Sequence, residues 1–222
     1  MNVNYITDNI QTTTLPSGRT YHTPDGDFSS ITTILGKTSP NLLWLEKWKA
    51  RVGEEEAQRV SKLATDRGTL VHEYLEKYWN GLDIKKDLAK ETQNVRALAE
   101  SLISATSQNV TSVNAQEVPI WSNSLKFAGR IDMVGYWQGI PAIIDFKTSK
   151  KVKQVKEIKD YFLQCCGYAY AHNELYATNI KKIVVIIAVD NKTEAQIFES
   201  VAPVFLPDLK FRISQYNKLY AV

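Results

Sequence analysis

The stretch that decides the fold runs from residue 127 to residue 149 and reads FAGRIDMVGYWQGIPAIIDFKTS. Two mostly apolar runs flank Gln138-Gly139, a dipeptide that suits a two-residue hairpin turn. A hairpin centred on that turn places Asp132 opposite Asp145. Directly opposed residues in a sheet have Cβ atoms about 4.5–5.5 Å apart. The sequence therefore predicts two carboxylates held side by side.

Two facing aspartates need positive charge nearby, because like charges directly opposite each other destabilise a sheet. Lys147 follows Asp145 by two residues, so strand alternation places it on the same face as the pair. The register depends on the turn. Pro141 falls inside the hairpin, and a bulge there would shift the pairing by one residue and separate the aspartates.

Glu117 adds a third carboxylate. Its strand ends at a turn over residues 122–124, and this turn predicts that Glu117 lies across from about residue 130, on the face of Asp132. Carboxylates are hard oxygen ligands, which suit Mg²⁺ or Mn²⁺ rather than zinc. The chemistry that needs them beside a lysine is metal-assisted hydrolysis of a phosphodiester. The metal polarises the phosphoryl oxygen, and Lys147 orients the attacking water or helps to deprotonate it.

The rest of the chain predicts a mixed α/β fold in a single domain, residues 1–222. Three regions follow from periodicity and turn signals: an N-terminal hairpin over 1–38, a helical region over 39–110, and an α/β catalytic core over 111–222. In the first region we expect strands at 19–23 and 28–35. In the second we expect helices at 41–51, 69–79 and 91–106, with a solvated charged stretch from residue 54 to residue 62. In the core we expect strands at 116–121, 126–137, 142–147 and 182–189 and helices at 160–175 and 207–220. The apolar strand 182–189 lacks alternation, so both of its faces should be covered.

Composition excludes several classes of protein. The net charge of +3 over 222 residues is too small to indicate a nucleic-acid partner by itself. Cys165 and Cys166 are adjacent, and a disulfide between neighbours would need a strained ring, so we expect both thiols to be reduced. Two cysteines are also too few for an iron–sulfur cluster or an all-thiolate zinc site. No apolar run is long enough for a membrane span, and residues 1–8 resemble neither a signal nor a transit peptide. We expect a monomeric cytoplasmic protein, bacterial or phage-encoded and acting in the host cytoplasm.

His72 lies on the predicted helix 69–79, on a face shared with Leu75 and Trp79. One interpretation is a hydrogen-bonded, half-buried histidine, which is the commoner role for a lone helical histidine. The other is a metal ligand, and an imidazole would make the site more suitable for Mn²⁺. The spacing alone leaves both open.

Two further features lie beside the predicted carboxylates. After Lys147 the chain is rich in lysine, including Lys150, Lys151 and Lys153. Such a run is usually a solvated face, but its position here favours contact with a phosphate backbone. On the helix 160–175, Gln164 and Tyr168 are four residues apart and share a face. They either contact the site or serve as core and capping residues.

Four of these motifs occur in an order that is familiar: GTLVHE at 68–73, GRID at 129–132, IDFKTS at 144–149 and QCCGY at 164–168. Together they resemble the RecB-type branch of the PD-(D/E)xK nuclease superfamily. Within it, the chain is most similar to the mitochondrial genome maintenance exonuclease family and its phage relatives. That likeness also takes in residues 29–35, residues 44–48, Glu117 and the strand 182–189. One departure is Ile131, which stands where the superfamily name has proline.

The resemblance implies a restriction-endonuclease-like core, a mixed sheet flanked by helices, with an N-terminal helical arch through which single-stranded DNA threads. It implies dependence on Mg²⁺ or Mn²⁺. By the resemblance, the metal is held by Asp132, Asp145, the Phe146 carbonyl and His72, with Glu117 at the matching acidic position. Lys147 would be the catalytic lysine. Gln164 and Tyr168 would contact DNA or support that lysine.

These observations together predict a metal-dependent exonuclease that hydrolyses single-stranded DNA from free ends, in phage or bacterial replication, repair or recombination. The alternatives are an exonuclease acting on duplex ends, an endonuclease of the same superfamily, and a non-catalytic DNA-binding module. The last is disfavoured because Asp132, Asp145 and Lys147 are all present.

Overall fold

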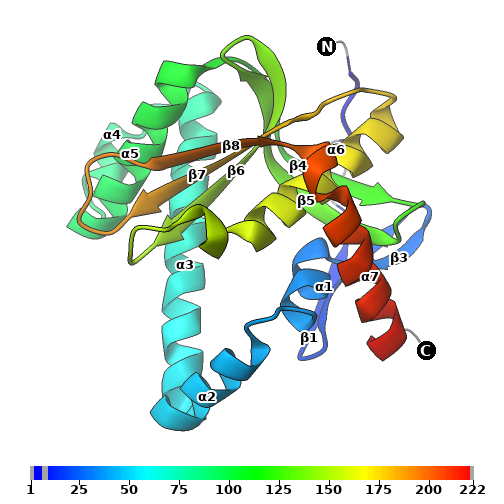
Figure 1. The fold of residues 1–222 in the computed structure, drawn as a ribbon. Coiled ribbons are helices and arrows are strands. Elements are labelled where there is room, and N and C mark those ends of the chain that lie inside the picture. The colour runs from blue at the N-terminus through cyan, green and yellow to red at the C-terminus, as the bar shows by residue number, and fades with distance from the viewer. Residues whose placement is uncertain (1–2, 7–9, 221–222) are drawn as a thin grey trace.

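A five-stranded mixed sheet forms the centre of the molecule (Figure 1). The computed structural model describes residues 3–6 and 10–220. The strand order is β4-β5-β6-β7-β8, and all neighbours are antiparallel except β6 and β7. The parallel pair is joined through a helix, α6, as parallel strands require a crossover. The strands are β4 (Val110–Ser122), β5 (Phe127–Trp137), β6 (Ile140–Ser149), β7 (Lys182–Val189) and β8 (Gln196–Val201). The predicted mixed α/β fold is confirmed.

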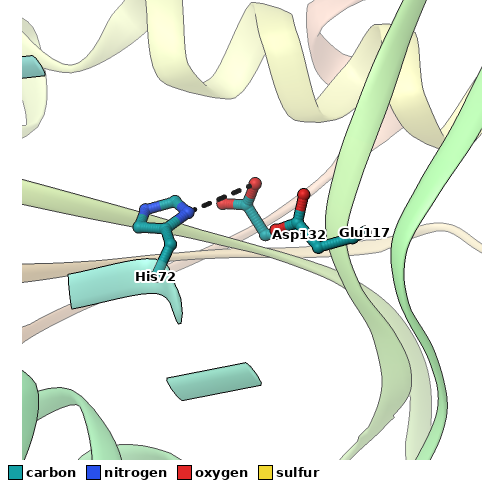
Figure 2. Close-up of side chains that lie close together, drawn as sticks. All are labelled: His72, Glu117 and Asp132. Carbon is teal, nitrogen blue, oxygen red and sulfur yellow. Dashed lines mark ion pairs between the residues drawn. The ribbon is translucent and has the colours of Figure 1, made fainter. Parts of the chain in front are cut away.

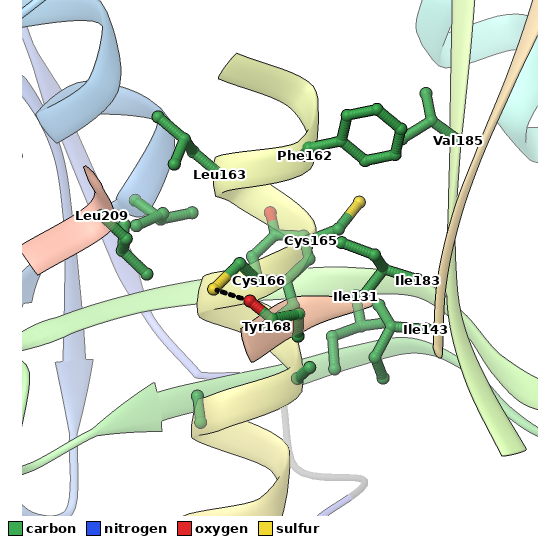
Figure 3. Packing of buried hydrophobic residues seen from close by; sticks show 14 of the residues in the cluster. Ile131, Ile143, Phe162, Leu163, Cys165, Cys166, Tyr168, Ile183, Val185 and Leu209 are labelled. Atoms are coloured by element: carbon green, nitrogen blue, oxygen red, sulfur yellow. Dashed lines mark hydrogen bonds between the residues drawn. The ribbon is translucent and has the colours of Figure 1, made fainter. Parts of the chain in front are cut away.

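Helices cover both faces of this sheet. On one face α6 (Lys159–Tyr176) packs against side chains such as Ile183 and Val185 of β7 (Figure 3). On the other face α3 (Glu54–Trp79) and α5 (Gln93–Asn109) pack against the alternate side chains of β7. All of these β7 side chains are buried, so the prediction that strand 182–189 is covered on both sides is confirmed.

The β5–β6 hairpin has the register that the sequence predicts. The ladder runs from Trp137–Ile140 to Met133–Ile144, around a turn in which Gln138 and Gly139 have φ of 50° and 80°. Two positive φ values are typical of a type I′ turn, whose twist matches that of the strands. Pro141 is accommodated in the ladder without a bulge, opposite Tyr136. Asp132 and Asp145 come directly after the last ladder pair.

The position of Glu117 differs from the prediction by two residues. Ladder pairs on either side of it, Gln116–Met133 and Val118–Ile131, place Glu117 opposite Asp132 rather than residue 130. The reason is the turn: β4 continues to Ser122, which pairs with Phe127, so the turn comprises residues 123–126 instead of 122–124. Glu117 itself has φ of 51°, which interrupts the ladder at this point.

The N-terminal region corrects a second prediction. Residues 28–35 do not form one strand; β3 (Gly26–Ser29) ends and α1 (Ile31–Lys37) begins. The Ser30 side chain accepts a hydrogen bond from the Thr33 backbone N–H at 3.0 Å, and this N-cap outweighs the β-propensity of the isoleucines and threonines that follow. The predicted hairpin is also larger, since β1 (Thr12–Leu15) joins β2 (Gly18–Thr23) and β3 in a three-stranded sheet.

The charged stretch 54–62, predicted to separate two helices, forms the beginning of α3. Its charged side chains are solvated as expected, although Ala57 is buried. The chain stays helical from Glu54 to Trp79, and only Gly53, with φ of 89°, separates α3 from α2 (Leu42–Val52). These arch helices, α2 and the first half of α3, project from the body at the lower left of Figure 1. No residue of α2 is buried.

The remaining elements are α4 (Lys85–Leu88), α7 (Leu206–Tyr220) and the short 3₁₀ turns Val155–Glu157 and Ala202–Phe205. Among the described residues, no helix combines the length and apolarity that crossing a membrane requires.

Candidate metal centre and catalytic site

Three side chains from different elements converge beside the β5–β6 hairpin: His72 of α3, Glu117 of β4 and Asp132 of β5 (Figure 2). Each offers a ligand atom, and these three atoms lie within 4.8 Å of one another. All three side chains are half-buried. Asp132 is held in place because its Oδ2 accepts a hydrogen bond from the Phe146 backbone N–H at 2.8 Å.

The orientation of His72 follows from its neighbours. Its Nε2 lies 3.0 Å from the Phe146 carbonyl oxygen, which can only accept, so the proton of this hydrogen bond is on Nε2. In the neutral ring Nδ1 then carries the lone pair, and it faces Asp132, with Nδ1 3.8 Å from Oδ1. The sequence left two roles open for His72, and the geometry is compatible with both. His72 makes a hydrogen bond through Nε2, and its Nδ1 is available as a metal ligand.

A second group lies behind the first, around Asp145. The Lys147 ammonium is 2.5 Å from Asp145 Oδ2 and 5.3 Å from the centre of the Tyr161 ring. Gln164 donates from Nε2 to Asp145 Oδ1 at 2.9 Å and also contacts the Tyr168 hydroxyl at 3.0 Å. The Asp145 side chain is fully buried. Gln164 and Tyr168 thus support the aspartate that pairs with the lysine.

The protonation states of these groups are set by burial and by their mutual charges. Burial, followed by the charge of Asp132, raises the pKa of Glu117 to about 7. Burial likewise raises the pKa of Asp145 to about 6, against the opposing effect of Lys147. Burial lowers the pKa of Lys147, but the charges of Asp145 and Asp132 outweigh it, so its pKa is raised overall. Lys147 is therefore a cation at neutral pH.

The donor set fits a hard divalent cation. Glu117 and Asp132 supply carboxylate oxygens, which suit Mg²⁺. His72 supplies an imidazole nitrogen, which makes the site more suitable for Mn²⁺. Asp145 Oδ2 is buried and lies 2.5 Å from the Lys147 ammonium, so the charge of this carboxylate is balanced by the lysine.

A cleft of about 470 Å³ opens in front of the three converging side chains. Its lining includes His72, Glu117, Asp132 and Tyr168. The structure does not bring Lys150, Lys151 or Lys153 into it. They lie on the loop after β6, where Lys150 and Lys151 are exposed and Lys153 is bound through its backbone to the Gln196 side chain. Their predicted contact with DNA stays a prediction.

Two ion pairs around the site were not predicted from the sequence. Arg67 donates from Nη1 to both carboxylate oxygens of Asp190 at 3.0 Å, which fixes the helix of His72 to the end of β7. Arg130 lies 3.9 Å from Glu117. Only Arg130 carried a signal, its place in the GRID motif, because the Arg67–Asp190 pair joins residues 123 positions apart.

The chain is similar to a family of nucleases and to proteins that are named as exonucleases. The sequence profile of the PD-(D/E)XK nuclease superfamily matches residues 44–210. The chain is 26% identical over 176 residues to mitochondrial genome maintenance exonuclease 1 of Xenopus tropicalis, covering 75% of this chain and 50% of that protein. It is 27% identical over 171 residues to the human protein of the same name, covering 72% and 48%. The chain thus spans about half the length of the curated relatives it matches.

A solved structure, that of SSO0001, aligns with 79% of this chain and 70% of its own, at 15% identity and a TM-score of 0.41, which is too low to support an argument. The conclusion rests instead on the profile, which matches most of the chain and includes every residue of the two groups described above. The chain belongs to the PD-(D/E)XK nuclease superfamily, whose members generally use divalent metal ions.

Proposed function

We propose that this protein is a Mg²⁺- or Mn²⁺-dependent exonuclease that degrades single-stranded DNA from free ends. The observation that carries the proposal is the convergence of His72, Glu117 and Asp132 next to the buried Asp145–Lys147 pair. Membership of a nuclease superfamily supplies the reaction class, and the relatives named as exonucleases supply the mode of attack. A bacterial or phage setting, in replication, repair or recombination in the cytoplasm, stays a prediction from the sequence.

In this proposal Asp132, His72 and Glu117 hold the ion, with Asp145 and the Phe146 carbonyl next to it. A divalent ion there would polarise the phosphoryl oxygens and favour deprotonation of the attacking water. Lys147 stays protonated because two carboxylates face it, so it acts as a hydrogen-bond donor and cation, orienting the nucleophile and stabilising the charge that develops on the phosphate. Asp145 positions Lys147, and Gln164 positions Asp145.

The preference for single strands rests on the arch helices. They project from the body and expose large apolar side chains, with Trp44 64% and Leu63 55% exposed. The Trp44 and Trp48 rings are nearly parallel, with centroids 6.5 Å apart. Aromatic side chains outside a core are typical surfaces for unstacked bases, which a duplex does not offer. If a strand passes between the arch helices and the body, it has to enter by an end.

An assay with end-labelled oligonucleotides and Mg²⁺ tests this proposal. Linear single-stranded DNA should be degraded, and a covalently closed single-stranded circle should be spared. Substrates blocked at the 5′ or the 3′ end give the polarity. Rapid nicking of the circle would show an endonuclease instead, and equal digestion of blunt duplex would show an enzyme that acts on duplex ends.

Two variants show whether the described site performs the reaction. Asp145→Asn removes the charge that holds Lys147 while keeping the acceptor for Gln164, and it should abolish cleavage while leaving DNA binding intact. Asp208→Asn is the matched control, because Asp208 is an exposed aspartate of α7 that pairs with Lys159. Unchanged cleavage by Asp145→Asn would refute the site assignment.

A further inference from the structure

Part of the cleft wall comes from the N-terminal three-stranded sheet. Thr12 of β1 and Arg19 and Tyr21 of β2 line the same cleft as His72 and Asp132. Arg19 and Tyr21 are two residues apart on one strand, and Thr12 pairs with Tyr21, so all three side chains belong to one face of this sheet. The N-terminal sheet therefore presents a cation to the space in front of the proposed metal site.

The backbone of Arg19 is held firmly in this position. Its N–H donates to the Thr33 hydroxyl at 3.0 Å, and its carbonyl accepts from the Ser30 N–H at 2.8 Å. Ser30 in turn forms a β-bridge with Ala128 of β5, the strand that carries Asp132. The neighbouring residue is Gly18, where a Cβ would collide with the Thr33 side chain. This close packing fixes the origin of the Arg19 side chain relative to β5.

The charges that line the cleft leave Arg19 available for an anion. Four acidic side chains line it, but only two arginines, Arg19 and Arg130. Arg130 lies 3.9 Å from Glu117. The Arg19 side chain is exposed. With the residues that the structure describes it makes one weak hydrogen bond, from Nε to the Thr14 hydroxyl at 3.4 Å, and no ion pair. A guanidinium in this state matches a phosphate group, which it can bind through two parallel hydrogen bonds.

We infer that Arg19 binds a backbone phosphate of the DNA strand in the cleft, so that the N-terminal sheet is part of the substrate-binding surface. This inference rests on the proposed function. Arg19 offsets the repulsion that the four acidic side chains of the cleft exert on a polyanion. Its role is to bind and align the strand, and it takes no part in the transfer of protons.

The test compares Arg19→Gln and Arg19→Lys with wild-type protein and with Arg96→Gln. Arg96 is a matched control because it lies on α5, donates to the Ala89 carbonyl and lines a different cleft. Binding of a fluorescent single-stranded oligonucleotide is measured by anisotropy with Ca²⁺ in place of Mg²⁺, over a series of salt concentrations. Steady-state kcat and KM are then measured with Mg²⁺.

We expect Arg19→Gln to weaken binding about tenfold, the loss of one hydrogen-bonded charge pair. The slope of log K against log salt should fall by about 0.7, the value for one phosphate contact on a single strand. KM should rise while kcat stays within about twofold, as for a loss of uniform binding. Arg19→Lys should keep the salt slope, since it keeps the charge, and Arg96→Gln should match the wild type in every measurement.

Binding and salt slope of Arg19→Gln equal to those of the wild type would overturn the inference while leaving the proposed function intact. A loss confined to kcat at unchanged affinity would overturn it as well, because that result would indicate a disturbed active site. Wild-type protein that neither binds nor cleaves DNA would refute the proposed function, and the role of Arg19 with it. Thermal melting of each variant checks that replacing the exposed Arg19 leaves the protein folded.

Discussion

The contact between Gly129 and Tyr168 supports a quantitative prediction about the site. A Cβ added at Gly129 of β5 would lie 2.5 Å from Tyr168 Cε1 and 3.3 Å from Cζ. Tyr168 is 4% exposed, and its hydroxyl contacts Gln164, which holds Asp145. Gly129→Ala therefore forces the ring or the strand to move, and the movement reaches the aspartate that pairs with Lys147.

The size of the effect follows from the distances. Carbon atoms in contact are normally about 3.5–4.0 Å apart, so the Tyr168 ring must shift by about 1 Å or more to accept the new methyl group. An extra methyl in a packed core costs about 1–3 kcal/mol. We expect Gly129→Ala to lower the free energy of unfolding by about 2 kcal/mol. The variant should also cleave more slowly, because the displaced Tyr168 ring would strain the Gln164–Asp145 hydrogen bond.

Urea denaturation with a double-mutant cycle isolates this contact. In a Tyr168→Leu background the ring is gone, so Gly129→Ala should cost less than about 0.5 kcal/mol. Gly36→Ala is the matched control, because a Cβ at Gly36 of α1 meets nothing within 4 Å and alanine favours a helix. An equal cost of Gly129→Ala in both backgrounds, or no cost in either, would refute the reasoning.

Three further predictions concern charge. Glu117 has a pKa of about 7 without metal, so metal binding should release a proton. The affinity for the metal ion, measured by calorimetry, should therefore rise by up to about tenfold per pH unit between pH 5 and 7 and level off above pH 7. An affinity that is constant over this range would contradict the prediction. Burial lowers the pKa of His172 to about 4, so its contribution to stability is complete above about pH 6.5 and lost as the pH falls toward 4. Compared with His172→Gln, the wild type should lose about 2 kcal/mol more between pH 7 and 5, as measured by denaturation. Asp190→Asn should cost about 1–3 kcal/mol, because it leaves half-buried Arg67 with a weaker partner; a change below about 0.5 kcal/mol would count against that pair.

The sequence predicted best where local chemistry controls geometry. The Gln138-Gly139 turn sets the β5–β6 register, so the juxtaposition of Asp132 and Asp145 could be obtained from residue numbers alone. The apolar run at 182–189 predicted a doubly covered strand because both of its faces needed partners. The same logic placed Glu117 two residues off, since the length of the turn after Ser122 could not be deduced from its composition.

Other features depend on contacts that a linear reading does not contain. The β-branched residues at 31–35 favour a strand by propensity, but the Ser30 cap and burial of Ile31 and Ile34 against the core make them helical. Strand β8 was missed because its exposed and half-buried residues, Gln196–Val201, carry a weak apolar signal at the edge of the sheet. The place of Arg19 in the cleft depends on how the N-terminal sheet docks on β5, which is a tertiary property.

The central claim is that His72, Glu117 and Asp132 form, with Asp145 and Lys147, a single metal-dependent centre for DNA cleavage. The most direct test measures release of label from a linear single-stranded oligonucleotide by wild type and by Asp132→Asn, in Mg²⁺ and in EDTA. We predict that cleavage requires Mg²⁺ and that Asp132→Asn slows it by about a hundredfold or more, while the variant still binds the strand. Cleavage by the wild type in EDTA, or an Asp132→Asn rate close to that of the wild type, would contradict the account.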